Sequence, residues 1–141
     1  LKVAGLNPHA GEEGILGTEE INLIQDSLSK WKLNNPKTNL EGPISPDSCW
    51  LSSAKAWQNQ DSMRHDGILA MYHDQGLIPM KIIAANYSVN TTLGLSFIRT
   101  SPDHGTGFNI AGKGIAQYQS MLEAIKTARE LSLKSRLLNS H

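Results

Sequence analysis

Two histidines each follow a short apolar run of the chain and stand near glycines. His9 comes after the run 3–6, and His73 follows the run 67–72 with Asp74 next to it. Imidazole is the commonest protein ligand for a transition metal, so two histidines from separate strand ends could share one cation. Their separation matches no local metal motif, and a structural or hydrogen-bonding role for each histidine is the alternative interpretation.

Three polar residues follow at nine-residue intervals, namely Lys81, Asn90 and Arg99. Two cations and an amide could bind a phosphate or a carboxylate group. Arg99 ends an apolar run, 93–98, where a charge is costly unless it has a partner. In the alternative interpretation Lys81 extends from an apolar helix into solvent, while Arg99 pairs with Asp103 or with a backbone carbonyl.

A glycine-rich stretch begins at His104 and continues through Gly105, Thr106 and Gly107. Small residues expose backbone N–H groups, which can bind the phosphates of a nucleotide. The stretch lacks the GxGxxG spacing of a classical dinucleotide site, so an ordinary tight loop is the alternative.

The elements that must position these residues alternate between strand and helix, which predicts an α/β protein. The predicted strands are four apolar segments: 3–6, 67–72, 89–93 and 96–99. The predicted helices are a segment capped by Thr18 that stops before 34–36, the segments 53–60 and 77–84, and a long helix from about 120. The apolar faces predicted for the first and last helices consist of Ile21, Ile24, Leu28 and Trp31, and of Met121, Ile125, Ala128 and Leu131.

The composition narrows the class of protein. The 141 residues carry thirteen basic and thirteen acidic side chains, which argues against nucleic acid or an anionic membrane as the main partner. A single cysteine, Cys49, permits neither an internal disulfide nor a thiolate metal cage. The apolar runs are too short to span a bilayer, so we expect a soluble, cytoplasmic protein. Because the chain starts with Leu1 directly before a predicted strand, we also expect it to be a piece of a longer protein.

Five ordered blocks resemble one known family, the 4-hydroxythreonine-4-phosphate dehydrogenases of pyridoxal phosphate biosynthesis. They lie within residues 6–20, 42–47, 70–81, 89–95 and 97–106. The most specific motifs are Asn7-Pro8-His9-Ala10-Gly11-Glu12, Tyr72-His73-Asp74-Gln75-Gly76 and Asp103-His104-Gly105-Thr106. The resemblance implies the two-domain α/β architecture of isocitrate and isopropylmalate dehydrogenases. Residues 1–141 would then form a single α/β unit, roughly the C-terminal half of such an enzyme.

The resemblance also implies roles for particular residues. His9 and His73 match metal ligands for zinc, magnesium or cobalt, with His73 reaching the ion of the neighbouring subunit in a homodimer. A third metal histidine of the family lies upstream of Leu1. The residues that match substrate-binding positions are Lys81, Asn90, Arg99 and Asp47, and Asp74 matches a carboxylate with a catalytic role. The residues that match the cofactor loop are His104, Gly105, Thr106 and Gly112.

The activity implied is an NAD- or NADP-dependent, metal-assisted oxidation of 4-phosphooxy-L-threonine with decarboxylation, and we expect this chain to be inactive alone. Two alternatives stay open. One is a dehydrogenase of a related four-carbon sugar-acid phosphate, such as threonate or erythronate 4-phosphate. The other is a non-catalytic domain that binds a phosphate or a nucleotide. Asn109 departs from the family pattern by lacking a carboxylate that could accept ribose hydroxyls, which puts the detail of the cofactor contacts in question.

Overall fold

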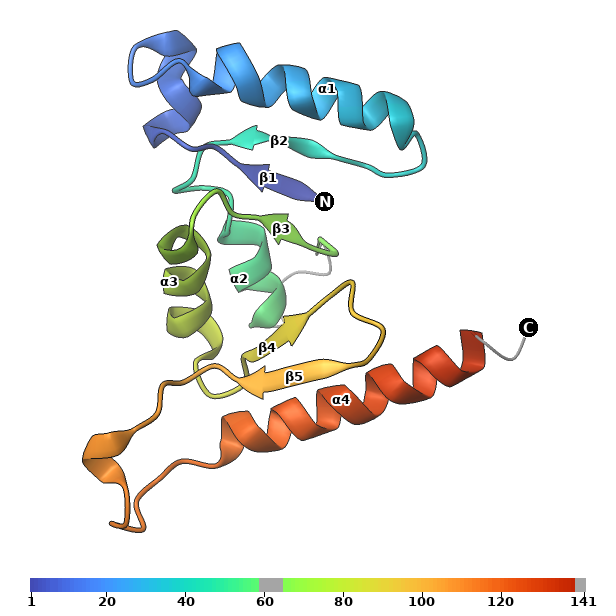
Figure 1. Ribbon diagram of the computed structural model, residues 1–141. Helices are drawn as coiled ribbons and strands as arrows, with labels where there is room; N and C mark the ends of the chain where they lie inside the picture. Colours follow the sequence, from blue (N-terminus) through green and yellow to red (C-terminus); the bar gives the residue numbers. More distant parts are fainter. Residues whose placement is uncertain (59–64, 139–141) are drawn as a thin grey trace. The chain divides into compact units, whose positions relative to one another are not determined.

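The computed structural model describes residues 1–58 and 65–138 (Figure 1). The chain folds into two compact units, Leu1–Pro79 and Met80–His141, and each is described by itself. Whether the chain acts as a single α/β unit within a longer two-domain dehydrogenase stays a prediction. The end of the predicted helix 53–60 lies outside the described residues.

The first unit is built on a parallel sheet of three strands in the order β2-β1-β3. The strands are β1 (Lys2–Ala4), β2 (Glu41–Ile44) and β3 (Ile68–Leu69). Lys2 is in register with Glu41 on one side and with Ile68 on the other. The central strand forms the core, since Val3 and Ala4 are 1% and 0% exposed. Because all three strands run in the same direction, their carboxyl ends meet at one edge of the sheet.

Two helices of the first unit agree only partly with the sequence prediction. A π-helical turn (Glu20–Ile24) leads into α1 (Gln25–Asn34), which ends one residue later than predicted, and α2 covers Leu51–Trp57. The predicted apolar face of the first helix is wrong, because Ile24 is buried whereas Ile21 and Trp31 are exposed. The predicted cap position agrees with the structure: Glu19 already has helical backbone angles (φ −64°, ψ −32°), and the carbonyl oxygen of Thr18 accepts from the backbone N–H of Asn22 at 2.8 Å.

The strand predicted at 67–72 is shorter and more exposed than expected. Only Ile68–Leu69 pairs with β1, and Leu69 is 58% exposed. Pairing stops because the backbone N–H of Met71 donates to Oε1 of Gln75 at 2.7 Å instead of to a neighbouring strand. The next helix, α3 (His73–Ala84), therefore begins at His73, four residues before the predicted start at residue 77, and it contains the boundary between the two units.

The second unit consists of an antiparallel hairpin and a long helix. The hairpin pairs β4 (Val89–Thr92) with β5 (Arg99–Pro102), so the predicted strand 96–99 lies three residues too early. Helix α4 (Gln119–Leu138) packs on the hairpin, where Oγ1 of Thr100 donates to the carbonyl oxygen of Ala124 at 2.9 Å. A short 3-10 turn, Phe108–Ile110, lies between the hairpin and α4.

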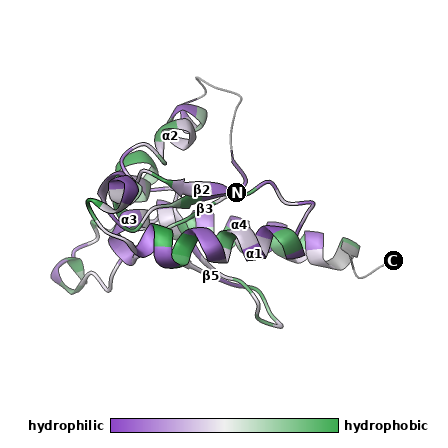
Figure 2. Ribbon diagram, turned by 90° about the horizontal axis from the view of Figure 1, so that it is seen from above, coloured by the Kyte–Doolittle hydropathy of each residue, from purple (hydrophilic) through white to green (hydrophobic). Residues whose placement is uncertain are grey.

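The buried face of α4 differs from the predicted one. Ser120 and Ala124 are buried against the hairpin, whereas Met121 and Ile125 are 47% and 60% exposed. Small residues at the contact let the helix approach the strands closely, and the serine hydroxyl makes hydrogen bonds there. Hydrophobic segments occur along the helices (Figure 2), and several of these residues, including Met121 and Ile125, are exposed.

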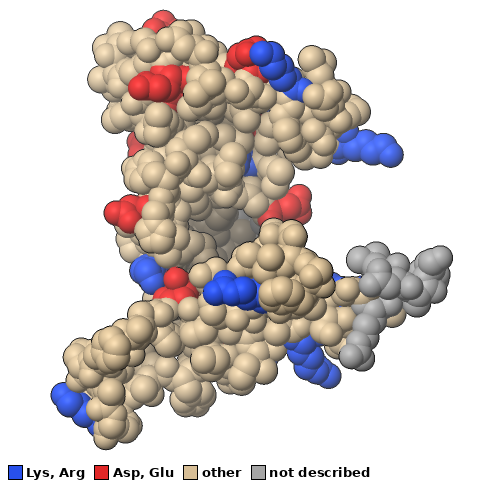
Figure 3. Space-filling view, viewed as in Figure 1, with Lys and Arg blue, Asp and Glu red and all other residues tan. Residues whose placement is uncertain are grey.

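The surface carries charges of both signs, scattered over the face shown in Figure 3. Within residues 1–58 and 65–138, no helix is both long and apolar enough to cross a membrane.

Candidate functional site

The fold brings the predicted metal and acid residues to one edge of the first unit. His9 follows β1, Asp47 follows β2, and both His73 and Asp74 follow β3. All three strands are parallel, so these four residues come after carboxyl ends that meet at the same edge. Open α/β sheets place their ligands outside this edge. The sequence predicted strands before His9 and before His73 but none before Asp47, and the strand order makes the ends of all three strands neighbours.

The side chain of Gln75 links two of these strand ends by hydrogen bonds. Its side chain is 7% exposed, and its Nε2 donates to the carbonyl oxygen of Gly5 at 2.7 Å, while its Oε1 accepts from Met71. One buried amide therefore joins the end of β1 to the first turn of α3, where His73 lies. Sequence reasoning quoted Gln75 only as part of a motif and did not assign it this role.

The loop that carries His9 has an unusual backbone. His9, Ala10, Glu12 and Glu13 all have positive φ, between 44° and 56°, and Gly11 lies among them at 83°. For residues with a Cβ this left-handed conformation costs about 1–2 kcal/mol each, so surrounding interactions must maintain it.

Glu20 supplies much of that restraint. It is fully buried, with Oε1 accepting from the backbone N–H groups of Leu6 at 2.7 Å and Asn7 at 2.8 Å. Its Oε2 accepts from Nδ2 of Asn7, which also donates to Oε2 of Glu19. Burial by itself raises the pKa of Glu20, but the hydrogen bonds from Asn7 and Leu6 together outweigh it and the pKa is lowered. An ionised carboxylate therefore holds the entrance of the His9 loop.

Sequence reasoning placed Glu20 in the first turn of a helix and missed this function. The space for its carboxylate depends on a glycine that only the fold brings near: a Cβ on Gly11 would lie 2.9 Å from Oε2 of Glu20.

Asp47 lies within electrostatic reach of His9. The Ser45 hydroxyl donates to Oδ1 of Asp47 at 2.5 Å and is the main cause of its lowered pKa, and a positive charge on His9 lowers that pKa further. These contacts keep the carboxylate ionised at neutral pH. Two residues predicted for the metal and for the substrate, far apart in the sequence, thus influence each other in the folded unit.

The two candidate metal ligands are chemically suited to a divalent cation. Both His9 and His73 are exposed, and among the described residues neither imidazole is engaged in a hydrogen bond. Two uncommitted imidazoles on one sheet edge are donors that zinc or cobalt accepts. In the part of the chain that the structure describes, no three His, Cys, Asp or Glu side chains gather closely enough to hold a metal on their own.

The predicted anion-binding residues all belong to the second unit, and Lys81 among them lies near the end of α3. Arg99 donates from Nη1 to Oγ1 of Thr92 at 2.9 Å, its register partner on β4. Since side chains alternate along a strand, Asn90 lies on the same face as Thr92, and this face is opposite to the one where Thr100 meets α4. The hairpin therefore presents Asn90 and Arg99 together on the face that α4 leaves open.

Lys81 rather than Arg99 is the residue that pairs with Asp103. Its Nζ lies 3.2 Å from Oδ2 of Asp103 and donates to the backbone oxygen of the same residue at 3.1 Å. In the alternative interpretation, the pairing of Arg99 with Asp103 is therefore wrong, whereas Lys81 does extend toward solvent, with 52% of its side chain exposed, while its ammonium contacts Asp103.

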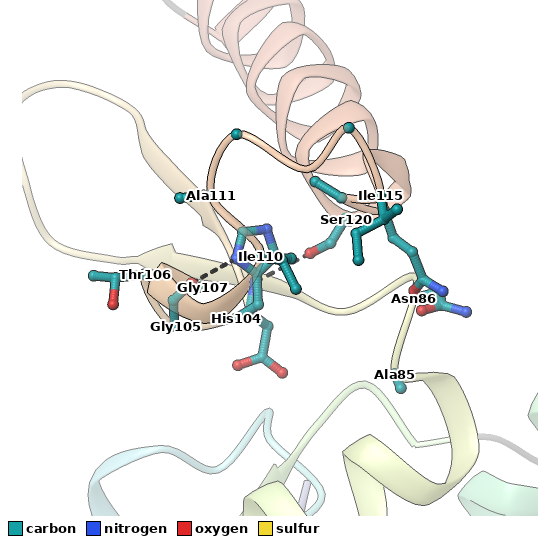
Figure 4. Close-up of a pocket in the computed structure, with 15 residues that line it drawn as sticks. Ala85, Asn86, His104, Gly105, Thr106, Gly107, Ile110, Ala111, Ile115 and Ser120 are labelled. Atoms are coloured by element: carbon teal, nitrogen blue, oxygen red, sulfur yellow. Dashed lines mark hydrogen bonds between the residues drawn. The ribbon is translucent and has the colours of Figure 1, made fainter.

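A pocket of about 630 Å³ occupies the second unit (Figure 4). All the residues predicted for the cofactor line it: His104, Gly105, Thr106 and Gly112. Nδ1 of His104 lies 3.0 Å from the carbonyl oxygen of Gly105, and because a carbonyl only accepts, this nitrogen is the donor. Asn109 is not among the residues that line the pocket, so its lack of a carboxylate does not alter the lining.

The fold and the site define an α/β protein with ionisable residues at the carboxyl edge of a parallel sheet and a glycine-rich pocket in a second unit. The model of the family described as "Pyridoxal phosphate biosynthetic protein PdxA" matches residues 1–128. The chain belongs to this family. The α/β class is confirmed, whereas the isocitrate dehydrogenase-like architecture stays a prediction.

Individual relatives agree with the family match. The 4-hydroxythreonine-4-phosphate dehydrogenase of Synechococcus sp. (strain RCC307) is 57% identical over 133 residues, covering 93% of this chain and 40% of the relative. The crystal structure of the enzyme of that name from Klebsiella pneumoniae superimposes with a TM-score of 0.71 at 42% identity, covering 90% of this chain and 36% of that one. A terephthalate 1,2-cis-dihydrodiol dehydrogenase from Burkholderia xenovorans LB400 gives 0.58 at 34% identity, covering 90% and 37%. The chain thus spans about 40% of the length of the curated relative.

Proposed function

We propose that this chain forms the C-terminal part of a cytoplasmic, homodimeric dehydrogenase with the isocitrate dehydrogenase-like architecture. The enzyme oxidises 4-phosphooxy-L-threonine with NAD or NADP and releases carbon dioxide. The observation that carries the proposal is that His9, Asp47, His73 and Asp74 follow the carboxyl ends of three parallel strands at one sheet edge. The names of the closely similar relatives agree with this substrate.

His9 and His73 would hold the divalent cation, either zinc, magnesium or cobalt, with the third histidine supplied by the upstream part of the polypeptide and the site shared between subunits. When bound, such a cation supplies Lewis-acid stabilisation of negative charge on the substrate's hydroxyl oxygen. The contribution of this chain is to fix the two imidazoles: Glu20 and Asn7 hold the His9 loop, and Gln75 holds the turn before α3.

Lys81, Asn90 and Arg99 would hold the phosphate group, which positions the reacting carbon. In the oxidation the substrate's carbinol carbon gives a hydride to the nicotinamide ring, and its hydroxyl gives a proton to a base, for which Asp74 is the candidate. The resulting 3-oxo acid then breaks its bond to the carboxylate, releases carbon dioxide and takes up a proton on carbon. Asp47, kept ionised by Ser45, would accept a hydrogen bond from the substrate.

The glycine-lined pocket of the second unit would take the nicotinamide cofactor. Glycines at 105, 107, 112 and 114 leave backbone N–H groups accessible to phosphate oxygens. Nε2 of His104 lies on the other side of the ring from the Nδ1 contact with Gly105 and is the nitrogen left for a contact with the cofactor. Neither contact distinguishes NAD from NADP.

The direct test is an assay of the full-length protein that contains this chain. Substrate, NAD and a divalent metal are combined, and the absorbance of the reduced cofactor is followed. We expect turnover with 4-phosphooxy-L-threonine that stops when the metal is chelated and returns when it is added back. Absence of turnover with every phosphorylated hydroxy acid tried would contradict the proposal.

A second candidate is that the 141-residue chain by itself is a non-catalytic phosphate- or nucleotide-binding domain. It is favoured by the finding that the described residues contain no complete set of three metal-binding side chains. We expect the isolated chain to show no turnover with the same substrate, cofactor and metal. Measurable turnover by the isolated chain would exclude this candidate.

The substrate class needs its own comparison, because one structural relative is named for a dihydrodiol that bears no phosphate. The exposed cations Lys81 and Arg99 favour a phosphorylated substrate. Assaying 4-phosphooxy-L-threonine beside threonate 4-phosphate, erythronate 4-phosphate and a cyclic cis-dihydrodiol distinguishes these possibilities.

A further inference from the structure

Asp103 stands at the point where the hairpin ends and the glycine-rich loop begins, and it makes polar contacts in several directions. Its Oδ2 accepts from Nζ of Lys81 at 3.2 Å and from Oγ of Ser88 at 3.1 Å. Its backbone oxygen accepts from the same Lys81 ammonium at 3.1 Å. Its backbone N–H donates to Oγ of Ser120 at 3.1 Å, and the Ser120 hydroxyl donates to the carbonyl oxygen of Ser88 at 3.2 Å.

These contacts connect the candidate phosphate ligand, Lys81, with the pocket proposed for the cofactor. Asp103 and Ser120 belong to the wall of the pocket, and Asp103 directly precedes His104 (Figure 4). Lys81 is a candidate for holding the substrate's phosphate. The Asp103 side chain is mostly buried, with 18% exposed, whereas that of Lys81 is 52% exposed. The carboxylate is therefore the fixed partner and the ammonium the accessible one.

The ammonium has a donor left for a ligand. A lysine ammonium carries three N–H donors, and two of them are directed at the carboxylate and the carbonyl of Asp103. The third donor and the exposed side of the group are available to an anion. A lysine side chain is otherwise flexible, so two acceptors on one residue remove much of the freedom that an incoming phosphate would have to restrict.

We infer that Asp103 is a positioning residue that orients Lys81 toward an anion and at the same time fixes the start of the pocket loop. The inference rests on the proposed function, because it takes Lys81 as a phosphate ligand and the pocket as the cofactor site. It adds a specific consequence: a change at Asp103 alters the binding of the anion and of the dinucleotide together, whereas a change at Lys81 alters only the binding of the anion.

Calorimetric titration of the full-length protein with inorganic phosphate and, separately, with NAD tests this without turnover. We expect Asp103→Asn to weaken phosphate binding about fivefold and NAD binding about threefold. Lys81→Met should weaken phosphate binding and leave NAD binding unchanged. In the Lys81→Met background, adding Asp103→Asn should have no further effect on phosphate but should still weaken NAD binding.

The matched control is Glu123→Gln, which removes the ion pair between Glu123 and Lys126 on α4. Its exposed fractions, 53% for Lys126 and 22% for Glu123, are close to those of the Lys81 and Asp103 pair. We expect it to change neither affinity. Phosphate binding by Asp103→Asn that equals this control, or that is stronger than wild type because a negative charge has been removed, would overturn the inference. Additive effects of Asp103→Asn and Lys81→Met on phosphate would overturn it as well.

Ser88→Ala covers the case in which Asp103→Asn does not fold. It removes a single hydrogen bond from the Asp103 carboxylate and should weaken phosphate binding about twofold, and no change there would overturn the inference. Failure of the proposed function can be told apart from failure of this inference. Wild-type protein that binds phosphate and NAD but oxidises no phosphorylated hydroxy acid contradicts the proposed activity and leaves the role of Asp103 standing. Wild-type protein that binds neither ligand contradicts both.

Discussion

Glu20 has no access to solvent, yet its carboxylate is stabilised as an anion by the donors around it. Those donors belong to Leu6 and Asn7, directly before the strained loop that carries His9. At the residue scale, the site is therefore determined as much by a buried acceptor as by the imidazole itself. A glutamate in a predicted helical turn gives no sequence signal of burial, because its partners are backbone groups brought together only by the fold.

Replacing Glu20 with Gln should lower the free energy of unfolding by about 1–3 kcal/mol. The amide oxygen can keep the two backbone donors, but the amide nitrogen would then face Nδ2 of Asn7, a donor that loses its acceptor. The hydrogen bonds lower the folded-state pKa of Glu20 below its unfolded value. The stabilisation is thus fully present above about pH 4.5 and is lost as the pH falls through the lowered value. Urea unfolding curves at neutral and acidic pH measure both effects.

Glu19→Gln is the control for this prediction. Glu19 is exposed, and its carboxylate accepts a hydrogen bond from Nδ2 of Asn7 but none from the backbone of Leu6 or Asn7. Its replacement should therefore change the free energy of unfolding much less. Equal losses for Glu19→Gln and Glu20→Gln would contradict the role given to the buried carboxylate.

Cys49 gives a second prediction at this scale. Burial raises the pKa of its thiol, with Lys2 opposing and Glu41 adding to the shift. The thiolate should therefore be scarce until the pH rises well above 9.0. We expect a disulfide reagent to modify the native protein at least about tenfold more slowly than the urea-unfolded protein at neutral pH. Equal rates would show that the thiol is accessible in the fold.

At the scale of elements, the loop between β1 and α1 depends on glycine for space as well as for backbone conformation. Gly11 and Gly94 have nearly the same φ, +83° and +84°. A Cβ on Gly11 would lie 2.6 Å from the carbonyl oxygen of Gly17, whereas a Cβ on Gly94 would have nothing within 4 Å. Replacing each glycine by alanine therefore distinguishes two costs: the cost of a left-handed backbone, which both variants have, and the cost of a steric clash of the new Cβ, which only the Gly11 variant has.

We expect Gly94→Ala to destabilise by about 1 kcal/mol, the backbone cost alone. Gly11→Ala should cost clearly more, because either Gly17 or Glu20 must move. Thermal unfolding of the two variants measures the difference. Similar losses in both would mean that the His9 loop is not tightly packed around Gly11.

Helix α4 shows where periodicity was informative and where it was not. The sequence predicted a long C-terminal helix, and the structure has one, Gln119–Leu138. The predicted face is buried only in part, since Ala128 and Leu131 are half-buried and the larger Met121 is exposed. Small residues contact the strands of the hairpin, and hydrophobicity alone does not identify a small-residue contact. Ala124 is 2% exposed while the larger Ile125 is 60% exposed.

Enlarging Ala124 to Leu should therefore destabilise the second unit by about 1–3 kcal/mol through overpacking. Ile125→Ala should change the stability of the 141-residue chain by no more than about 0.5 kcal/mol. Denaturant titration of both variants tests the assignment of the buried face. If Ile125→Ala destabilised the chain more than Ala124→Leu, the face predicted from the sequence would be the buried one.

At the scale of the whole molecule, the sequence was sufficient for the family, the α/β class and most helices, because motif order and apolar runs are local properties. It was insufficient for the contacts that join distant segments. Gln75 with Gly5, Lys81 with Asp103 and Glu20 with Leu6 all depend on which distant segments the fold brings together. The end of β3 was misjudged for the same reason, since a side-chain acceptor from α3 replaces strand pairing.

The central claim is that His9 and His73 hold one metal ion between two subunits of a dimer. Mixing full-length His9→Ala protein with full-length His73→Ala protein tests it most directly, with His65→Ala as a control that should keep full metal content. If each site takes His9 from one subunit and His73 from the other, a mixed dimer has one intact site and one that lacks both imidazoles. We predict that each variant alone is inactive and poor in metal, and that exchange of subunits restores about half of the metal and the activity per mixed dimer. Mixed dimers that stay as inactive and metal-poor as the parents would contradict the claim.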